Sequence, residues 1–319
     1  MGALPTSDEV RAARELLRRY LPQTRLVAAP SLTRALGAPV SLKLESELPT
    51  GSFKPRGAIW TLATRMSRET VREVVASSSG NHGAAVALAA SLLQISATIF
   101  LPINPNPIKR RRIAELGARI VEVGAIDLTG AADAAADAAA ERGAFFLNDA
   151  TDLDLPAGPA TIALEILEQA PDTGAIFVPI GDSALIRGVA TAARHVRPGI
   201  RVVGVQAENA PCYYLSWKQG RAVPTDSCDT IADGLATRIP QPASVSAVAT
   251  VVDEIVLVTE DQLLAAVKHL LIEEHIVAEP SGAATTAAAM APVGLREPTV
   301  LLVTGGNLAP ELLPRVAAV

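Results

Sequence analysis

Short, uncharged and mostly apolar runs recur along this chain, and helical segments follow them. Ala97–Leu101, Ala175–Pro179, Val202–Val205 and Thr299–Val303 are such runs. Continuous apolar runs of this length are typical of parallel strands that are buried on both faces. Their alternation with helices predicts an α/β fold built from open, mostly parallel twisted sheets flanked by helices. At about 150 residues per domain, 319 residues indicate two domains.

Composition and charge exclude several classes of protein. Hydrophobic residues make up 49% of the chain and charged residues 19%, which argues against disorder. The net charge of −5 does not favour nucleic-acid binding, which depends on a basic face. The apolar stretch Ala84–Leu93 is too short to span a membrane. Cys212 and Cys228 are interpreted as reduced thiols, which predicts a cytoplasmic protein.

The turns after the strands are where parallel sheets bind ligands, and two of them carry reactive side chains. Lys54 lies at the start of a predicted helix, two residues before Arg56. The helix dipole and a neighbouring cation both disfavour an ammonium, so Lys54 is a candidate nucleophile; the alternative is an ordinary solvated lysine. The turn Ser77–Gly83 combines hydroxyls, glycines and an amide at a helix start. It is either a site for a carboxylate or an N-capping cluster.

Five segments, in order, resemble one enzyme family. They are Ser52–Ala58, Ser78–Gly83, Ile231–Ala236, Glu279–Ala283 and Thr304–Asn307. The resemblance is to the threonine/serine dehydratase and serine racemase group, pyridoxal 5′-phosphate (PLP) enzymes of fold type II, with the tryptophan synthase β-like fold. It implies that a small domain, residues 73–150, is inserted into a large PLP-binding domain formed by residues 1–72 and 151–319. It also implies a homodimer that acts on a small amino-acid substrate.

The resemblance assigns roles by position. Lys54 is expected to carry the cofactor and to act as the base at the substrate Cα. Thr304 is expected at the pyridine nitrogen. The residues implied to contact the cofactor are Phe53, Lys54, Asn81, Gly181, Asp182, Ser183, Ala184, Leu185, Gly234 and Thr304. The residues implied to hold the substrate are Ser78, Ser79, Gly80, Asn81 and His82.

The turn Gly181–Leu185 departs from the family, which has a run of glycines there to hold the phosphate. Serine and alanine fit such a cradle if φ stays negative, because the cradle uses backbone amides. A carboxylate beside a phosphate is repulsive, so we expect Asp182 to turn away toward Arg187 and Ser183 to donate its hydroxyl to the phosphate. The same run resembles the serine-nucleophile motif of lipase-like hydrolases. That interpretation lacks an Asp-x-x-His segment to complete a triad.

The function implied by the resemblance is elimination of water from a β-hydroxy amino acid, giving a 2-oxo acid and ammonia. Three alternatives stay open: a serine or aspartate racemase in which Ser79 works on the opposite ring face, a β-replacement synthase, and a non-catalytic PLP-binding protein. No tight metal site is expected, because Gln206, Ala210 and Cys212 stand where some relatives have carboxylates.

Overall fold

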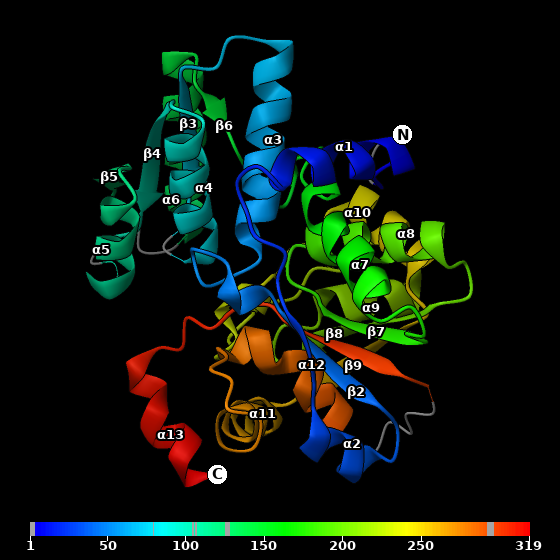
Figure 1. Ribbon diagram of the computed structural model, residues 1–319. Coiled ribbons are helices and arrows are strands. Elements are labelled where there is room, and N and C mark those ends of the chain that lie inside the picture. Colours follow the sequence, from blue (N-terminus) through cyan, green and yellow to red (C-terminus); the bar gives the residue numbers. More distant parts are fainter. Residues whose placement is uncertain (1–3, 79, 104, 106, 125–127, 292–296) are drawn as a thin grey trace.

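Two sheets with helices on their faces make up the molecule (Figure 1). The computed structural model describes residues 4–78, 80–103, 105, 107–124, 128–291 and 297–319. The larger sheet has six strands in the order β1-β2-β10-β7-β8-β9, and the smaller has four in the order β5-β4-β3-β6. All neighbours pair in parallel except β1 and β2. The predicted fold class is confirmed.

The strands of the larger sheet are β1 (Leu26–Ala28), β2 (Val40–Leu44), β7 (Ala175–Pro179), β8 (Arg201–Ala207), β9 (Glu254–Val258) and β10 (Thr299–Val303). Those of the smaller sheet are β3 (Glu73–Ser77), β4 (Ser96–Leu101), β5 (Arg119–Glu122) and β6 (Phe145–Phe146). Strands β7 and β10 are buried at every residue, as their unbroken apolar runs predict.

Helices cover both faces of the larger sheet. On one face lie α1 (Ser7–Leu17), α7 (Ala157–Gln169), α8 (Ala184–Val196), α9 (Cys212–Gln219) and α10 (Pro242–Val251). On the other lie α2 (Pro30–Leu36), α11 (Glu260–Ile272) and α12 (Pro280–Met290), and α13 (Leu313–Ala318) packs on α11 (Figure 1). Each set shares a hydrophobic core with the sheet.

The smaller sheet has its own two layers of helices. The layer on one face contains α3 (Lys54–Arg68), α4 (Asn81–Leu92) and α5 (Pro107–Glu115), and α6 (Leu128–Arg142) covers the other. Helix α3 packs on both α4 and α7, so it joins the two sheets. The chain division at residues 72/73 and 150/151 stays a prediction.

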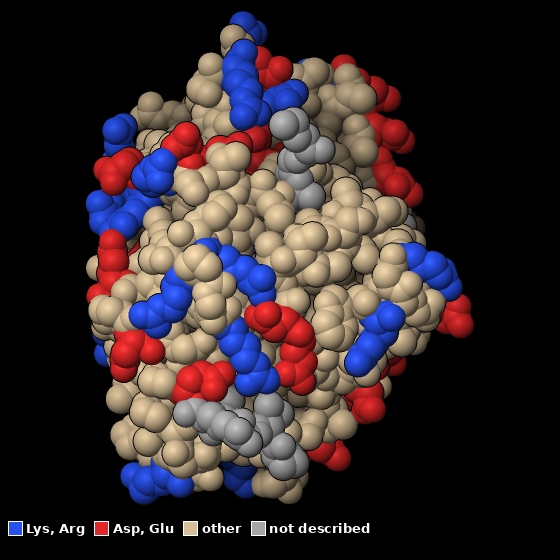
Figure 2. Space-filling view, turned by 90° about the vertical axis from the view of Figure 1, so that its right-hand side faces the viewer, with Lys and Arg blue, Asp and Glu red and all other residues tan. Residues whose placement is uncertain are grey.

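Surface charge is mixed rather than segregated. On the face shown in Figure 2, basic and acidic side chains are interspersed and separated by broad uncharged areas. Within the described part of the chain, every helix is too short or too polar to cross a membrane.

The fold brings distant turns to one place. Strands β3, β6, β7 and β10 lead into residues 78, 147, 180 and 304, each at the carboxyl end of a parallel strand. Ser52 forms a β-bridge with Gly305, and the Phe53 amide donates to the Thr304 carbonyl at 3.0 Å. Helix α3 therefore begins against the turn that follows β10.

Candidate active site

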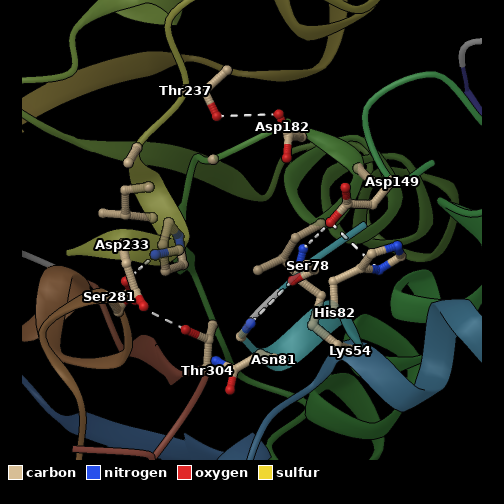
Figure 3. Close-up of a pocket in the computed structure, with 18 of the residues that line it drawn as sticks. Lys54, Ser78, Asn81, His82, Asp149, Asp182, Asp233, Thr237, Ser281 and Thr304 are labelled. Carbon is tan, nitrogen blue, oxygen red and sulfur yellow. Dashed lines mark hydrogen bonds and ion pairs between the residues drawn. The ribbon is translucent and has the colours of Figure 1, made fainter. Parts of the chain in front are cut away.

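A cavity of about 420 Å³ lies where these turns meet. It is lined by thirteen of the fourteen predicted site residues: Phe53, Lys54, Ser78, Gly80, Asn81, His82, Gly181, Asp182, Ser183, Ala184, Leu185, Gly234 and Thr304. Ser79, the fourteenth, lies outside the described residues. The labelled side chains surround one space in Figure 3. The fold therefore brings the described members of this predicted set to one cavity, and their roles stay predictions.

Lys54 is the first residue of α3 and forms an ion pair inside the cavity. Its Nζ lies 2.6 Å from Asp149 Oδ2, and His82 Nδ1 lies 3.6 Å from the same oxygen (Figure 3). Burial lowers the pKa of Lys54, but the carboxylates of Asp149 and Asp182 outweigh burial, so the pKa is raised. Without bound cofactor, Lys54 is therefore an ammonium, and the expectation of a neutral lysine at this helix start is wrong.

Arg56 takes no part in tuning Lys54, because residues two apart on a helix point in different directions. Its guanidinium is 2% exposed and lies between two buried carboxylates, those of Glu45 and Glu165. The nitrogen–oxygen distances run from 2.7 to 3.0 Å. Burial disfavours this cation, but both carboxylates outweigh burial and raise the pKa of Arg56. Lys43 pairs with Glu165 at 2.6 Å and completes the network.

The carboxylate of Asp149 and the ammonium of Lys54 stabilise each other's charged forms. Burial disfavours the carboxylate, but His82 and Lys54 outweigh burial, so the pKa of Asp149 lies below its usual range. Burial lowers the pKa of His82, and the Lys54 charge lowers it further. These effects outweigh the Asp149 charge, which raises it. His82 Nε2 is 3.3 Å from the Leu147 carbonyl. With its pKa lowered and its Nε2–H directed at the Leu147 carbonyl, a neutral His82 has no Nδ1 proton to give to Asp149, so Lys54 is the partner that holds this carboxylate.

Asn81 is oriented by two other residues. Its Nδ2 donates to Glu279 Oε1 at 2.6 Å, and its Oδ1 accepts from Asn307 Nδ2 at 2.6 Å. Asn307 Nδ2 also donates to the Thr50 carbonyl, and Arg112 donates to Asn307 Oδ1. Because α5 carries Arg112, this chain of bonds runs from the smaller sheet's helices to the turn after β10.

Ser281 connects the two other walls of the cavity. Its hydroxyl accepts from the Gly234 amide at 2.9 Å, and its carbonyl accepts from Thr304 Oγ1 at 3.4 Å. A Cβ on Gly234 would lie 2.9 Å from Ser281 Oγ, which is closer than real contacts allow. Glycine is therefore needed to keep this wall flat.

The Gly181–Leu185 turn differs from expectation in two ways. Ser183 has φ of +71°, so the expectation of a negative φ is wrong. The residue is strained, because a non-glycine residue is destabilised in the left-handed conformation. Ser183 Oγ accepts from Arg187 Nε at 3.2 Å, while Asp182 Oδ1 accepts from Thr237 Oγ1 at 3.2 Å. Asp182 is thus held by Thr237, and Arg187 attracts it electrostatically. With Ser183 Oγ bonded to Arg187, the hydrolase interpretation has no support.

Six polar residues that line the cavity were not among the predicted site residues: Ser77, Asp149, Asp233, Thr237, Glu279 and Ser281. Asp149 follows the end of β6, the same strand-end position that drew attention to the other turns. Four of them lie within segments that the sequence singles out, without a predicted role in this site: Ser77, Asp233, Glu279 and Ser281. Thr237 carries no sequence signal of its own.

Comparison with known proteins assigns the family. Residues 17–305 match the family described as "Pyridoxal-phosphate dependent enzyme". The chain belongs to this family. It is 35% identical to an L-threonine ammonia-lyase of Thermotoga maritima over 312 residues, 98% of this chain and 78% of that protein. Maize serine racemase superposes with a TM-score of 0.91 at 29% identity, covering 98% and 96% of the two chains. The processed form of threonine deaminase isoform 2 from Solanum lycopersicum gives 0.91 at 28% identity, covering 100% of this chain and 90% of that one.

The family's cofactor, PLP, fits the residues that line the cavity. A lysine amine that can attach to an aldehyde projects into it. Helix α8 begins at the cavity wall, and the Ser183 side chain does not cap it, so its first amides suit a phosphate. The flat wall at Gly234 leaves room for a planar ring. The predicted cofactor is confirmed by the family match.

Proposed function

We propose that this PLP-dependent lyase eliminates water from a β-hydroxy amino acid of the threonine or serine type, releasing a 2-oxo acid and ammonia. The observation that carries the proposal is the single cavity in which Lys54 faces Asn81, Thr304 and the start of α8. The identity to the Thermotoga maritima L-threonine ammonia-lyase over 98% of the chain supports the reaction class.

The bound cofactor supplies the electron sink that makes the substrate Cα acidic. In the proposal, Lys54 accepts the Cα proton, and Asp149 at 2.6 Å stabilises the ammonium that forms. Asn81, held by Glu279 and Asn307, orients the ring. Thr304 would supply a hydroxyl to the ring nitrogen, and a hydroxyl is too weak an acid to protonate that nitrogen fully. Such an environment would suit elimination of the β-hydroxyl.

The substrate carboxylate is proposed to bind at the start of α4, beside Ser78 and Gly80. Gly80 N donates to Ser78 Oγ at 3.1 Å, which orders the loop before the helix. The carboxylate would lie against the positive end of α4, and His82, the second residue of that helix, closes one side. Ser79 is proposed to contribute to the same loop.

A direct test uses the purified holoenzyme. It should be yellow, borohydride should fix the cofactor on Lys54, and a panel of β-hydroxy amino acids in both enantiomers should show 2-oxo acid from at least one. Lys54→Ala should lose both the borohydride adduct and the activity, while Lys218→Ala, an exposed lysine, should keep both. A yellow protein that forms no 2-oxo acid from any member of the panel would favour a binding role and refute the proposal.

Racemisation is a second candidate, favoured by the similarity to maize serine racemase. If Ser79 serves the opposite ring face, Ser79→Ala abolishes racemisation and largely spares elimination of the L-enantiomer. Equal loss of both activities contradicts the two-face assignment.

We also propose that the protein is a cytoplasmic homodimer with the inserted small domain described above. Both cysteines are free thiols, which supports a reducing compartment. Sedimentation equilibrium of the holoenzyme tests the dimer, and a mass near that of one chain would overturn it.

A further inference from the structure

The carboxyl group of Asp182 lies in the wall where the family binds the cofactor's phosphate. It directly precedes Ser183, the N-cap of α8, and it lines the cavity with Ser183, Ala184 and Leu185. An ionised Asp182 carboxylate and an ionised phosphate in the same wall repel each other. The position therefore needs an arrangement that lets an acid and a phosphate coexist.

The side chain is fixed in this position rather than free to turn away. Thr237 Oγ1 donates to Asp182 Oδ1 at 3.2 Å, and Tyr213 Oη donates to the Asp182 carbonyl at 3.5 Å. The other carboxyl oxygen points away from Thr237, toward the space between the labelled side chains (Figure 3). This oxygen is therefore placed to meet a ligand in the cavity.

The groups around Asp182 come from several elements. Lys54 of α3 and Asp149 after β6 face it across the cavity, and Arg187 of α8, which is 1% exposed, faces it from the protein interior. Cys212 and Tyr213 of α9 also face it, and burial raises the pKa of both, so both stay neutral near pH 7. Burial raises the pKa of Asp182 most, and the Asp149 charge raises it further. Lys54, the Thr237 hydrogen bond and Arg187 lower it, and the net result is a pKa of about 6.

We propose that Asp182 binds the cofactor's phosphate as a neutral carboxylic acid that donates its proton to a phosphate oxygen. One oxygen of Asp182 accepts from Thr237, and the other carries the proton that bridges to the phosphate. Arg187 and the first amides of α8 supply the remaining positive potential. The bound unit thus contains the phosphate, the carboxyl group and one shared proton.

A consequence is that binding takes up a proton from solvent at alkaline pH. A phosphate monoester has its second pKa near 6, so above about pH 7 both free partners have lost that proton. A complex that holds one proton more than its separated parts weakens about tenfold per pH unit. A cradle made only of backbone amides lacks this dependence.

The probe is pyridoxamine 5′-phosphate, which has no aldehyde and cannot attach to Lys54. Its dissociation constant, measured by fluorescence on protein stripped of bound cofactor and returned to neutral buffer, should rise about tenfold from pH 7 to pH 8. Asp182→Asn keeps the shape but has no titrating proton, so its dissociation constant should stay nearly constant over that range. Asp152→Asn is the matched control, because burial raises the pKa of Asp152 outside the cavity. It should behave as the unchanged protein does.

A second measurement needs no variant. Calorimetric titration at pH 7.5 in two buffers of different ionisation enthalpy should report uptake of about one proton per ligand bound. Uptake near zero, or the same pH slope in the unchanged protein and Asp182→Asn, overturns the proposal. Equal affinity for pyridoxamine without its phosphate overturns it as well. Because the probe is not turned over, these outcomes are independent of whether the reaction class proposed above is right.

Discussion

Replacing Arg56 with methionine should destabilise the protein severely while leaving the cavity wall intact. Arg56 is 2% exposed and bonds Glu45, which is fully buried, and Glu165, which is nearly so. With Lys43, the network contains two cations and two carboxylates, so it is neutral. The substitution leaves a buried net charge of −1, and breaking a buried pair in this way costs about 3–5 kcal/mol. At roughly 2.1 cal/mol/K of unfolding entropy per residue, 319 residues give about 1.5 °C per kcal/mol, so Tm should fall by about 4–8 °C.

The assay is thermal unfolding of the holoenzyme followed by circular dichroism. Arg18→Met is the control, since it removes an exposed ion pair with Glu15 that contributes less than about 1 kcal/mol. Arg56→Lys should lie between the two, because an ammonium cannot bond both carboxylates in the forked geometry of a guanidinium. A fall in Tm no larger than that of Arg18→Met would refute the reasoning.

The pH dependence of the same variant has a defined sign. Burial raises the pKa of Glu165, but Arg56 and Lys43 outweigh burial, so the net pKa is lowered in the unchanged protein. That carboxylate therefore contributes stability above its unfolded pKa, and the contribution is lost on acidification. Without Arg56, burial dominates and the pKa rises, so acid relieves the charge. The difference in Tm between Arg56→Met and the unchanged protein should shrink from pH 8 to pH 5.5, and a growing difference contradicts this account.

Three further outcomes follow from the site. Asp149→Asn should lower kcat about tenfold or more, equivalent to about 1.4 kcal/mol, because the protonated Lys54 loses its partner at 2.6 Å, and an unchanged kcat counts against that role. Ser183→Gly should be more stable than Ser183→Ala by about 1 kcal/mol in urea unfolding, since both lose the hydroxyl and only alanine strains at φ +71°; equal stabilities would contradict the strain. Adding Mg²⁺ or Ca²⁺ should leave Tm and activity unchanged, since among the described residues no three acids, histidines or cysteines gather as a metal site, and a large rise in either would overturn this.

The local sequence pattern was sufficient to predict strands and helix starts, which depend on residues close together in the chain. The apolar runs predicted β7 and β10. The starts of α1 and α11 also depend on near neighbours, because Thr6 and Thr259 form capping boxes there. Helices α2, α7 and α10 were harder to recognise, because α7 and α10 are rich in small and β-branched residues and α2 has only seven.

One error could have been avoided from helix geometry alone. Lys54 and Arg56 are about 200° apart around the helix axis, so the second cation could not tune the first. The Arg56 side chain instead points into the interior, where it forms ion pairs with Glu45 and Glu165. Their pairing required packing α3 on α7, which the one-dimensional pattern does not contain.

The sequence by itself determined the α/β class, through its strand runs, and the cofactor, through the resemblance of its turn motifs to one family. It also predicted which turns meet, because the ends of parallel strands share one sheet edge. Only the tertiary structure decided the charge state of that site. Asp149 reaches Lys54 across 95 positions of chain, and Thr237 reaches Asp182 across 55. Electrostatic interactions depend on distance in space and on burial, and neither is set until the two sheets have packed around the cavity.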